Sequence, residues 1–523
     1  MARIRVKDLT FCYDGGIDNI FENASFSIDT DWRLGFIGRN GKGKTTFLNL
    51  LLGKYQYRGV IDAPSGFRYF PYQVTERQMG MEAWEFLDEL EAGCELWQAA
   101  RELADLGETD EILYRPFGSL SPGERTKILL AVMFAGDGGF FLIDEPTNHL
   151  DREARETVQT YLALKKGFIL VSHDRDLLDA CTDHCLVLNR KTIEVVSGNF
   201  SVWWENKTRR DQAAVSENEK HLREIRKLKE TSARAAGWAD KNESTKIGFD
   251  PVKVHDRFIG TRSYIGAKTK KMQSRVKQME KRIGREILEK EGLLKDLEAS
   301  ADLRLTILSH HKSVLVEARD YGIRYKPAGQ PVFEGLDLSV EKGERVALAG
   351  RNGCGKSTLL RSVLGKSRQE SLLPDVEETG VCRTAAGLVI SYVGQEAREL
   401  KGSLRELCRE RELDESLFLA VLRQLDFERT QFLKNMEDYS EGQKKKVLLA
   451  ASLVTPAHLY IWDEPLNYID IFSRIQIEKL LLEYQPAMLF VEHDADFCRR
   501  IATKTVRFGG PARGISDGGH FIY

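Results

Sequence analysis

A P-loop motif, G-x-x-x-x-G-K-[S/T], occurs twice in this chain and constrains its fold more than any other feature. It reads GRNGKGKT at residues 38–45 and GRNGCGKS at residues 350–357. Each copy lies between an apolar run with strand character, RLGFIG or RVALAG, and a segment with helix character, TTFLNLLLG or STLLRSVLG. Strand, glycine-rich loop and helix in this order form the context in which the motif cradles nucleotide phosphates. The sequence therefore predicts two ATP sites.

The two motifs belong to a repeat that involves both ends of the chain. When Lys44 is aligned with Lys356, 312 residues later, the strings LSPGE, FLIDEP and LVSHD match YSEGQ, YIWDEP and FVEHD at nearly equal spacings. Apolar runs at 33–37, 139–143 and 167–171 alternate with helical segments, which is typical of a parallel sheet with crossover helices. A period this long indicates a duplicated domain rather than a solenoid.

Each half repeats the residues that ATP hydrolysis requires. The P-loop lysine is expected to reach the β- and γ-phosphates, and the hydroxyl after it to contact Mg²⁺. An aspartate ends an apolar strand and can hold the magnesium shell, and the glutamate after it can polarise the attacking water. A histidine at the end of another strand is a candidate phosphate sensor. The candidate catalytic residues are Glu145, Glu464, His173 and His493.

The composition is that of an ordinary globular protein, with 42% hydrophobic and 30% charged residues. The longest apolar run, 128–143, is interrupted by Asp137, Gly138 and Gly139, which excludes a bilayer span there. The first ten residues lack the apolar core of a signal peptide, and eight scattered cysteines fit a reducing cytosol. Cys181, His184 and Cys185 mark a helix end entering a strand rather than a metal site.

A basic stretch joins the two halves. Residues 220–282 hold 18 Lys and Arg against 7 Asp and Glu, a local charge of +11 in a chain of net charge −2. Apolar residues recur at helical spacing on both sides of a segment that contains Gly, Pro and Asn. These residues are Leu222, Ile225, Leu228, Met272, Val276, Met279 and Ile283. The pattern predicts two long antiparallel helices at about 203–236 and 267–299, joined by a tip at about 237–266.

Aromatic side chains cluster at this predicted tip, where they cannot serve the seam between the helices. A charge of one sign together with clustered aromatic rings favours contact with RNA phosphates and unpaired bases. A solvated helical spacer is the alternative, because charged runs usually form solvated faces. The candidate tip residues are Lys253, Phe258, Arg262 and Tyr264.

The ordered motifs of both halves resemble those of ABC-type ATPase domains, and LSPGE and YSEGQ are similar to that family's LSGGQ signature. The resemblance implies that Gln73 and Gln395 belong to the glutamine loops. It also implies that Tyr13 and Tyr325 stack on adenine, with an edge-strand tyrosine as the alternative. The implied magnesium ligands are Thr45, Gln73, Asp144, Ser357, Gln395 and Asp463. The implied nucleotide-binding residues are Tyr13, Gly38, Asn40, Gly41, Gly43, Lys44, Thr45, Thr46, Gln73, Ser121, Gly123, Asp144, Tyr325, Gly350, Asn352, Gly353, Gly355, Lys356, Ser357, Thr358, Gln395, Ser440, Gly442 and Asp463.

In that family two domains close head to tail, so each nucleotide lies between one P-loop and the signature of the other domain. Carried over, Lys44 faces Ser440 and Gly442, and Lys356 faces Ser121 and Gly123. Pro122, Glu124 and Glu441 depart from the signature. Proline removes one backbone N–H and the carboxylates oppose phosphate charge, so we expect slow hydrolysis at both sites.

Two such domains on one chain, a basic helical linker and no membrane domain resemble the ABC-F family of translation factors. The strings YSEGQKKK, WDEPLNYID and DRFIGTRSYIGAKTKKM are similar to the antibiotic-resistance branch of the Vga/Lsa type. The implied fold is α/β, with tandem ABC-type P-loop ATPase domains at 1–202 and 313–523 and an antiparallel helical hairpin linker at 203–312.

The same resemblance implies a cytoplasmic ATPase that uses ATP and Mg²⁺ and binds the tRNA exit site of the ribosome. Its partners would be large-subunit rRNA and P-site tRNA, with no membrane and no DNA, and it would act as a monomer. It would displace lincosamides, pleuromutilins and streptogramin A from the peptidyl-transferase centre. Three alternatives stay open: a housekeeping ABC-F factor, the ATPase subunit of a drug exporter, and a DNA-repair ATPase with a coiled-coil insertion.

Overall fold

The structure is a computed structural model that carries side chains and describes most of the chain. The described residues are 2–13, 19–64, 66–136, 138–148, 150–189, 191–247, 274, 278, 281–283, 285, 305–326, 330–395, 400–425, 427, 431–508 and 516–517. The chain divides into two compact units. One unit comprises Met1–Trp203 with Ala301–Tyr523, and the other comprises Trp204–Ser300. Both predicted ATPase halves therefore lie in the same unit.

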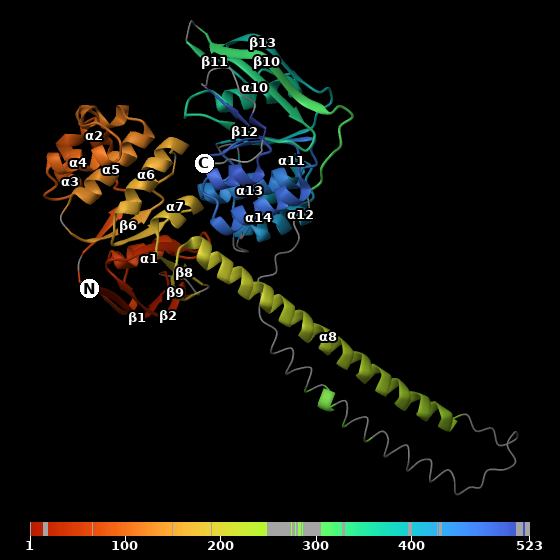
Figure 1. Cartoon of the computed structure of the whole chain (residues 1–523). Helices are drawn as coiled ribbons and strands as arrows, with labels where there is room; N and C mark the ends of the chain where they lie inside the picture. The colour runs from red at the N-terminus through yellow and green to blue at the C-terminus, as the bar shows by residue number, and fades with distance from the viewer. Residues whose placement is uncertain are drawn as a thin grey trace, which may run out of the picture. The chain divides into compact units, whose positions relative to one another are not determined.

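Each half contains one antiparallel and one mostly parallel sheet (Figure 1). In the first half the strand orders are β2-β1-β4 and β5-β6-β7-β3-β8-β9, with only β9 antiparallel to its neighbour in the larger sheet. The strands are β1 Arg3–Phe11, β2 Phe21–Asp29, β3 Arg33–Ile37, β4 Arg58–Asp62, β5 Phe67–Phe70, β6 Phe140–Asp144, β7 Phe168–Val171, β8 His184–Leu188 and β9 Ile193–Ser197. Chain neighbours that are not sheet neighbours require crossovers, as the alternating pattern predicted.

The second half repeats this topology with the orders β11-β10-β13 and β14-β15-β16-β12-β17-β18. Its strands are β10 Val314–Tyr325, β11 Pro331–Glu341, β12 Arg345–Ala349, β13 Val376–Thr384, β14 Ile390–Val393, β15 Leu459–Asp463, β16 Met488–Val491, β17 Lys504–Arg507 and β18 Ser516–Asp517. The equal strand order confirms the predicted duplication of an α/β domain.

Helices flank the sheets and supply the crossovers. In the first half they are α1 Lys44–Leu51, α2 Glu76–Met79, α3 Leu87–Leu90, α4 Leu96–Asp105, α5 Pro122–Ala135, α6 Arg152–Leu164 and α7 Arg175–Cys181, with 3-10 turns at Ala83–Phe86, Asp110–Tyr114 and Phe117–Ser119. In the second half they are α10 Lys356–Arg368, α11 Leu404–Glu410, α12 Glu415–Gln424, α13 Glu441–Val454, α14 Ile471–Tyr484 and α15 Ala495–Ile501, with 3-10 turns at Gln431–Leu433 and Met436–Asp438.

The cores form because the central parallel strands are apolar on both faces. Every residue of β7, β15 and β16 is buried, as expected for strands that are covered by layers on each side. The first-half core packs α1 against the sheets through Phe47, which contacts the rings of Phe21, Phe26 and Phe36. These buried strands hold the polar residues at their carboxyl ends in place, which positions the predicted sites.

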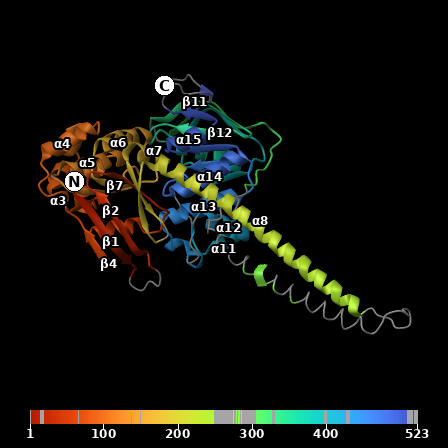
Figure 2. The same ribbon diagram turned by 60° about the horizontal axis from the view of Figure 1, so that its bottom comes forward.

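The linker begins with α8, a continuous helix at Phe200–Ile247 (Figures 1 and 2). This helix runs past residue 236, about where the first linker helix was predicted to end, so that helix is longer than predicted. The remainder of the predicted tip, 248–266, lies outside the described residues. Between residues 210 and 231, the buried or half-buried residues of α8 are Ala214, Asn218, His221, Ile225 and Leu228, with the alternating spacings of four and three that mark a helix seam.

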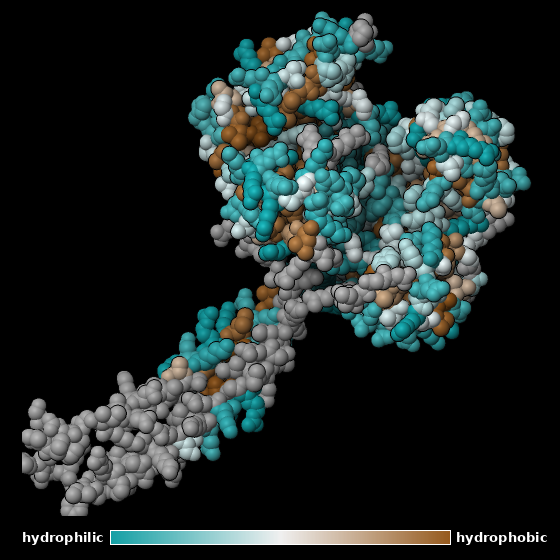
Figure 3. Space-filling model, turned by 180° about the vertical axis from the view of Figure 1, so that it is seen from behind, coloured by the Kyte–Doolittle hydropathy of each residue, from teal (hydrophilic) through white to brown (hydrophobic). Residues whose placement is uncertain are grey.

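Leu222 was predicted to lie in this seam, but its side chain is 52% exposed because the seam position is occupied by the residue before it. The described surface of α8 is otherwise largely hydrophilic (Figure 3). Of the second predicted helix, Ile283 is described and buried, whereas Met272, Val276 and Met279 lie outside the described residues. Within the described part of the chain, no helix combines the length and apolar character that a bilayer crossing requires.

Candidate nucleotide-binding sites

Both P-loops turn into their helices through a glycine that no other residue could replace without strain. Gly43 and Gly355 have φ of 108° and 99° and stand directly before α1 and α10. A Cβ on Gly43 would lie 2.6 Å from Ile20, and one on Gly355 would lie 2.5 Å from Val332. Neither helix start has a side-chain cap, so the first-turn N–H groups remain available to an anion such as phosphate.

The P-loop lysines are buried and curl back over their own loops. The Nζ atom of Lys44 donates to the carbonyl oxygens of Gly38 and Arg39 at 2.6 and 3.2 Å, and to Oδ1 of Asn40 at 3.2 Å. Lys356 donates to Gly350 and Arg351 at 2.7 and 2.9 Å. Burial lowers the pKa of Lys44, although nearby carboxylates oppose this shift. These ammonium groups lie at the loop centres, where the predicted phosphates would bind. The other P-loop glycines Gly41 and Gly353 also have positive φ.

The strand-end aspartates are suited to a cation. Thr45 donates from its hydroxyl to Asp144 at 3.2 Å, and Tyr69 donates to the same carboxylate oxygen at 3.1 Å. Asp463 is fully buried, and neither of its carboxylate oxygens has a hydrogen-bond partner in the described structure. Burial raises the pKa of both aspartates, which a bound cation would reverse. The paired hydroxyl and carboxylate oxygens are the hard donors that Mg²⁺ prefers, so the residues fit the predicted ion.

The predicted base and histidine lie together in each half. The Nε2 atom of His173 is 3.4 Å from Oε1 of Glu145, and that of His493 is 3.3 Å from Oε1 of Glu464. Both glutamates have left-handed φ, 52° and 49°, directly after their strands. Such strain at matched positions is typical of functional residues, because the surrounding structure must hold the side chain in one direction.

The two glutamates differ in electrostatic environment. Burial and the neighbouring Asp144 carboxylate raise the pKa of Glu145 to about 8. Burial alone would also raise the pKa of Glu464, but the hydrogen bond and charge of His493, with Gln395 and Lys445, hold that pKa below its usual value. Burial, together with the charges of Lys44 and Arg474, lowers the pKa of His173 well below its usual value. The first-half carboxyl therefore holds its proton to a higher pH than the second-half carboxyl does.

Each signature serine caps the helix that follows it. Ser121 caps α5 in a capping box with Glu124, and Ser440 caps α13 in a capping box with Gln443. The Glu124 carboxylate also accepts from Arg115 at 3.1 Å. Burial raises the pKa of Glu124, but the Ser121 N–H and hydroxyl and Arg115 outweigh it and hold the pKa below its usual value. The negative charge that departs from the signature pattern is thus partly neutralised within its own half.

Residues of the first half help to form the site of the second P-loop. A cavity of about 500 Å³ lies over Lys356, and its walls come from both halves. The second half contributes Tyr325, Val332, Asn352, Gly353, Gly355, Lys356, Ser357, Thr358, Gln395, Glu464, Asn467 and His493, and the first half contributes Pro122, Leu150 and Arg155. Pro122 stands between Ser121 and Gly123, which themselves are not among the lining residues described for this cavity.

Residues of the second half likewise approach the first P-loop. The Asn40 side chain donates to the Tyr468 carbonyl oxygen at 2.9 Å. Asp470, Arg474 and Lys446 lie close enough to influence the pKa of His173. Gly442 of the second signature packs against Tyr468, because a Cβ at this glycine would lie 3.0 Å from the Tyr468 oxygen.

The predicted adenine-stacking tyrosines lie beside their P-loops. The Tyr13 hydroxyl is 2.8 Å from the Thr46 hydroxyl, and the Tyr325 hydroxyl is 3.2 Å from that of Thr358. Tyr13 is 44% exposed, so its ring offers a free surface for stacking. The glutamine-loop residues differ: Gln395 donates to Glu464 at 3.1 Å, whereas Gln73 is exposed beyond the end of β5.

Several residues of these sites were missed from the sequence. Asn467 donates to Glu464 at 2.7 Å, and Lys445 donates to the backbone oxygens of Gly394 and Glu464. The signal for Asn467 was present, because EPTN and EPLN share an asparagine three residues after each predicted base. Lys445 had no such signal, since the first half has Thr126 there. The proposed tip residues Lys253, Phe258, Arg262 and Tyr264 lie outside the described residues.

Cys181, His184 and Cys185 have ordinary structural partners. The two thiols donate to the carbonyl oxygens of Gln159 and Gly198, and the His184 ring stacks on Trp32. Among the described residues no cluster of three or more His, Cys, Asp or Glu could hold a metal ion.

Comparison with known proteins assigns both halves to one family of domains. The ABC transporter family model matches residues 21–148 and 333–467. The ribosome protection protein VmlR of Bacillus subtilis (strain 168) is 25% identical over 495 residues, which cover 93% of this chain and 84% of that protein. The ATP-binding protein Uup of Caulobacter vibrioides (strain ATCC 19089 / CIP 103742 / CB 15) is 25% identical over 512 residues, which cover 95% of this chain and 76% of that protein.

A solved structure shares the fold. A chain in the complex of archaeal ribosomal stalk protein aP1 with archaeal ribosome recycling factor aABCE1 matches with a TM-score of 0.59 at 16% identity. The match covers 96% of this chain and 88% of that chain. The tandem arrangement of two ABC ATPase domains is thus found along nearly the whole chain.

Proposed function

The chain belongs to the ABC transporter family and hydrolyses ATP, and we propose that it is a ribosome-associated ABC-F ATPase that protects the ribosome from antibiotics. The observation that carries this proposal is the alignment of 93% of the chain with a ribosome protection protein, which extends beyond the two domain matches. Identity of 25% supports a shared kind of activity and leaves the drug spectrum to experiment.

In the proposed reaction the P-loop amides and lysines bind the ATP phosphates at both sites. In their ionised forms Glu145 and Glu464 orient a water molecule and accept its proton as it attacks the γ-phosphate, and His173 and His493 contact the same phosphate. Mg²⁺, when bound with ATP, would add positive charge opposite the phosphates, held by the Thr45–Asp144 and Ser357–Asp463 pairs. Hydrolysis and phosphate loss would then release the halves from each other.

The proposed ribosome contact is the basic linker. Lys220, Arg226 and Lys227 are exposed on α8, where they can neutralise RNA phosphates. We expect the linker, with its candidate tip residues, to approach the peptidyl-transferase centre beside P-site tRNA. Lincosamides, pleuromutilins and streptogramin A bind there, and the linker would displace them while ATP keeps the protein on the ribosome.

Cosedimentation with ribosomes tests the first part of this proposal. The double variant Glu145→Gln with Glu464→Gln should retain ATP and pellet with ribosomes when ATP is present. The matched control, Lys44→Ala with Lys356→Ala, should stay in the supernatant because it cannot hold the phosphates. The complex should dissociate as salt increases, in proportion to the phosphate contacts. A glutamine variant that stays free of ribosomes in saturating ATP would refute ribosome association.

Translation in a purified extract tests the second part. The wild-type protein should restore synthesis in the presence of lincomycin, and the Lys44→Ala with Lys356→Ala variant should not. A protein that binds ribosomes but restores nothing would be a housekeeping ABC-F factor. Lower drug accumulation in cells without restored synthesis in the extract would indicate the ATPase subunit of an exporter instead.

A further inference from the structure

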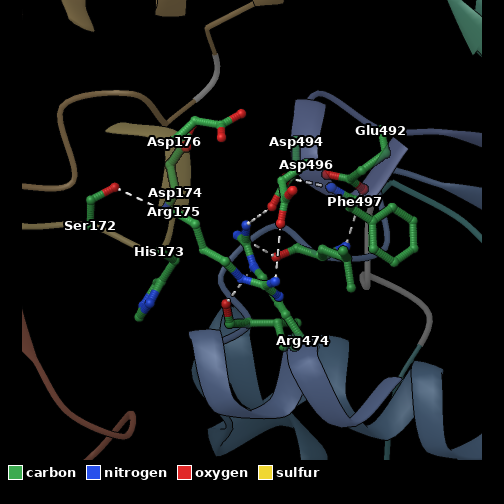
Figure 4. A network of polar contacts seen from close by, with 12 residues as sticks. Ser172, His173, Asp174, Arg175, Asp176, Arg474, Glu492, Asp494, Asp496 and Phe497 are labelled. Carbon is green, nitrogen blue, oxygen red and sulfur yellow. Dashed lines mark hydrogen bonds and ion pairs between the residues drawn. The ribbon is translucent and has the colours of Figure 1, made fainter. Parts of the chain in front are cut away.

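A buried arginine ties the segment after His173 to the second half of the chain (Figure 4). Arg175 donates from Nη1 to Oε2 of Glu478 at 3.1 Å and from Nη2 to Oε1 at 2.5 Å. Its Nη1 atom also donates to Asp496 at 3.2 Å. The side chains of Arg175 and Glu478 are 7% and 4% exposed. Two parallel bonds between a guanidinium and a carboxylate fix direction as well as distance.

The bridge lies next to the predicted catalytic pair of the first half. Arg175 is two residues after His173, whose ring contacts Glu145. Between them, Asp174 caps α7 by accepting from Leu177 and pairs with Arg155 at 3.5 Å. The segment is short and held at both ends, so a displacement of Arg175 would move the histidine ring.

The second half has no counterpart of this arginine. With His173 aligned on His493, Arg175 corresponds to Ala495. With the helix N-caps Asp151 and Asp470 aligned, Glu478 corresponds to Gln159. The Gln159 side chain donates within its own half, to the Asp176 carbonyl oxygen at 3.2 Å. A second bridge between the halves, from Arg499 to Asp176, lies beside the first but is exposed. In the described structure the buried bridge therefore serves one of the two histidines.

We propose that Arg175 is a positioning residue that sets His173 against the second half, so that catalysis at the Lys44 site depends on it and catalysis at the Lys356 site does not. This rests on the proposed roles of Glu145 and Glu464. The two sites then differ: the histidine of the first site is anchored by a buried ion pair across the halves, and the histidine of the second site has no counterpart of that pair among the described residues.

Steady-state hydrolysis by the full chain tests this with each site isolated. Glu464→Gln leaves the Lys44 site active, and Glu145→Gln leaves the Lys356 site active. Arg175→Met keeps the apolar stem and removes the charge. We expect kcat to fall about tenfold or more in the Glu464→Gln background, with KM for ATP within about twofold, because a small displacement of a catalytic group costs rate. In the Glu145→Gln background kcat should stay within about twofold. Arg175→Lys should recover part of the loss, and Arg499→Ala, the matched exposed bridge, should change neither background.

An equal loss of kcat in both backgrounds would overturn the proposal and assign the bridge a purely structural role. No loss of kcat in either background would also overturn it. Should Arg175→Met fail to fold, Arg175→Glu with Glu478→Arg restores the pair in reverse, and its Lys44-site activity should exceed that of Arg175→Glu. The variants Glu145→Gln and Glu464→Gln with Arg175 intact test the assignment of the two bases by themselves. If neither variant lowers hydrolysis, that assignment fails. The effect of Arg175→Met is then measured with Lys356→Ala, which leaves the Lys44 site, and with Lys44→Ala, which leaves the Lys356 site.

Discussion

The side-chain amide of Asn40, in the first P-loop, donates a hydrogen bond to the main-chain carbonyl of Tyr468, 428 residues later. The same Asn40 accepts from the P-loop lysine Lys44 through its oxygen. Tyr468 has φ of 66°, in the left-handed region. The first site is thus connected to the second half of the chain through the main chain of that half.

Removal of the Asn40 amide should slow the first site. In a Glu464→Gln background, Asn40→Ala should lower kcat/KM about fivefold, since one net hydrogen bond contributes about 1 kcal/mol. Tyr468→Asn is the matched control, because it keeps the carbonyl and tolerates positive φ. ATPase assays check both, and equal rates for Asn40→Ala and the background alone would contradict the prediction.

The buried ion pair of Asp470 and Lys446 should make the free energy of unfolding depend on pH. Their charged atoms are 3.1 Å apart. Burial by itself raises the pKa of Asp470, but Lys446 and the Ser473 N–H outweigh it and hold the pKa well below its usual value. A depressed carboxyl pKa stabilises the fold above the unfolded pKa, and this contribution is lost as pH falls through the folded pKa.

Asp470→Asn should therefore lower the free energy of unfolding by about 3 kcal/mol at pH 7, and the difference from wild type should shrink below about pH 4. Asp151→Asn is the matched control, because asparagine also caps a helix and should cost less than about 1 kcal/mol. Urea denaturation across pH measures both. A gap that persists unchanged down to about pH 2.5, below the ordinary carboxyl pKa, would rule out the charge as its cause.

Two glycines with nearly equal φ should respond differently to substitution by alanine. Gly380 and Gly387 have φ of 70° and 73°. A Cβ on Gly380 would lie 2.0 Å from the Asp320 carbonyl oxygen, whereas one on Gly387 would meet nothing within 4 Å. Gly387→Ala should cost about 1 kcal/mol for left-handed strain. Gly380→Ala should cost roughly 3 kcal/mol or more because the backbone must also move. Thermal melts decide this, and similar melting temperatures would contradict it.

The carboxylate of Glu124 should slow the second site. Its charge stands at the N-terminus of α5 in the first-half signature and is partly offset by Arg115. Glu124→Gln in a Glu145→Gln background should raise hydrolysis about two- to fivefold, since one charge at a helix terminus is worth about 0.5–1 kcal/mol. Arg115→Ala should lower hydrolysis, and the added substitution Glu124→Gln should cancel that loss. An Arg115→Ala defect that persists when Glu124→Gln is also present would place the effect of Arg115 elsewhere.

Local order was readable from the sequence because each motif acts through near neighbours. Gly43 needs a left-handed φ to start α1, and Ser121 and Ser440 cap the helices that they precede. Because each motif occurs in both halves, the sequence predicted the fold of each half independently. The seam of α8 was only partly predicted, since Leu222 and His221 are adjacent and pattern alone did not decide which of them faces inward.

What the sequence by itself determined is the chemistry of each half: phosphate-binding loops, strand-end carboxylates and the duplicated α/β domain. What only the tertiary structure decided is how the halves differ. The pKa of Glu145 rises to about 8 because burial removes water from it, and Arg175 finds Glu478 across the interface. Neither result has a local signal in the sequence. The Arg175–Glu478 pair joins side chains more than 300 residues apart, and the pKa of Glu145 depends on the exclusion of solvent by packed residues.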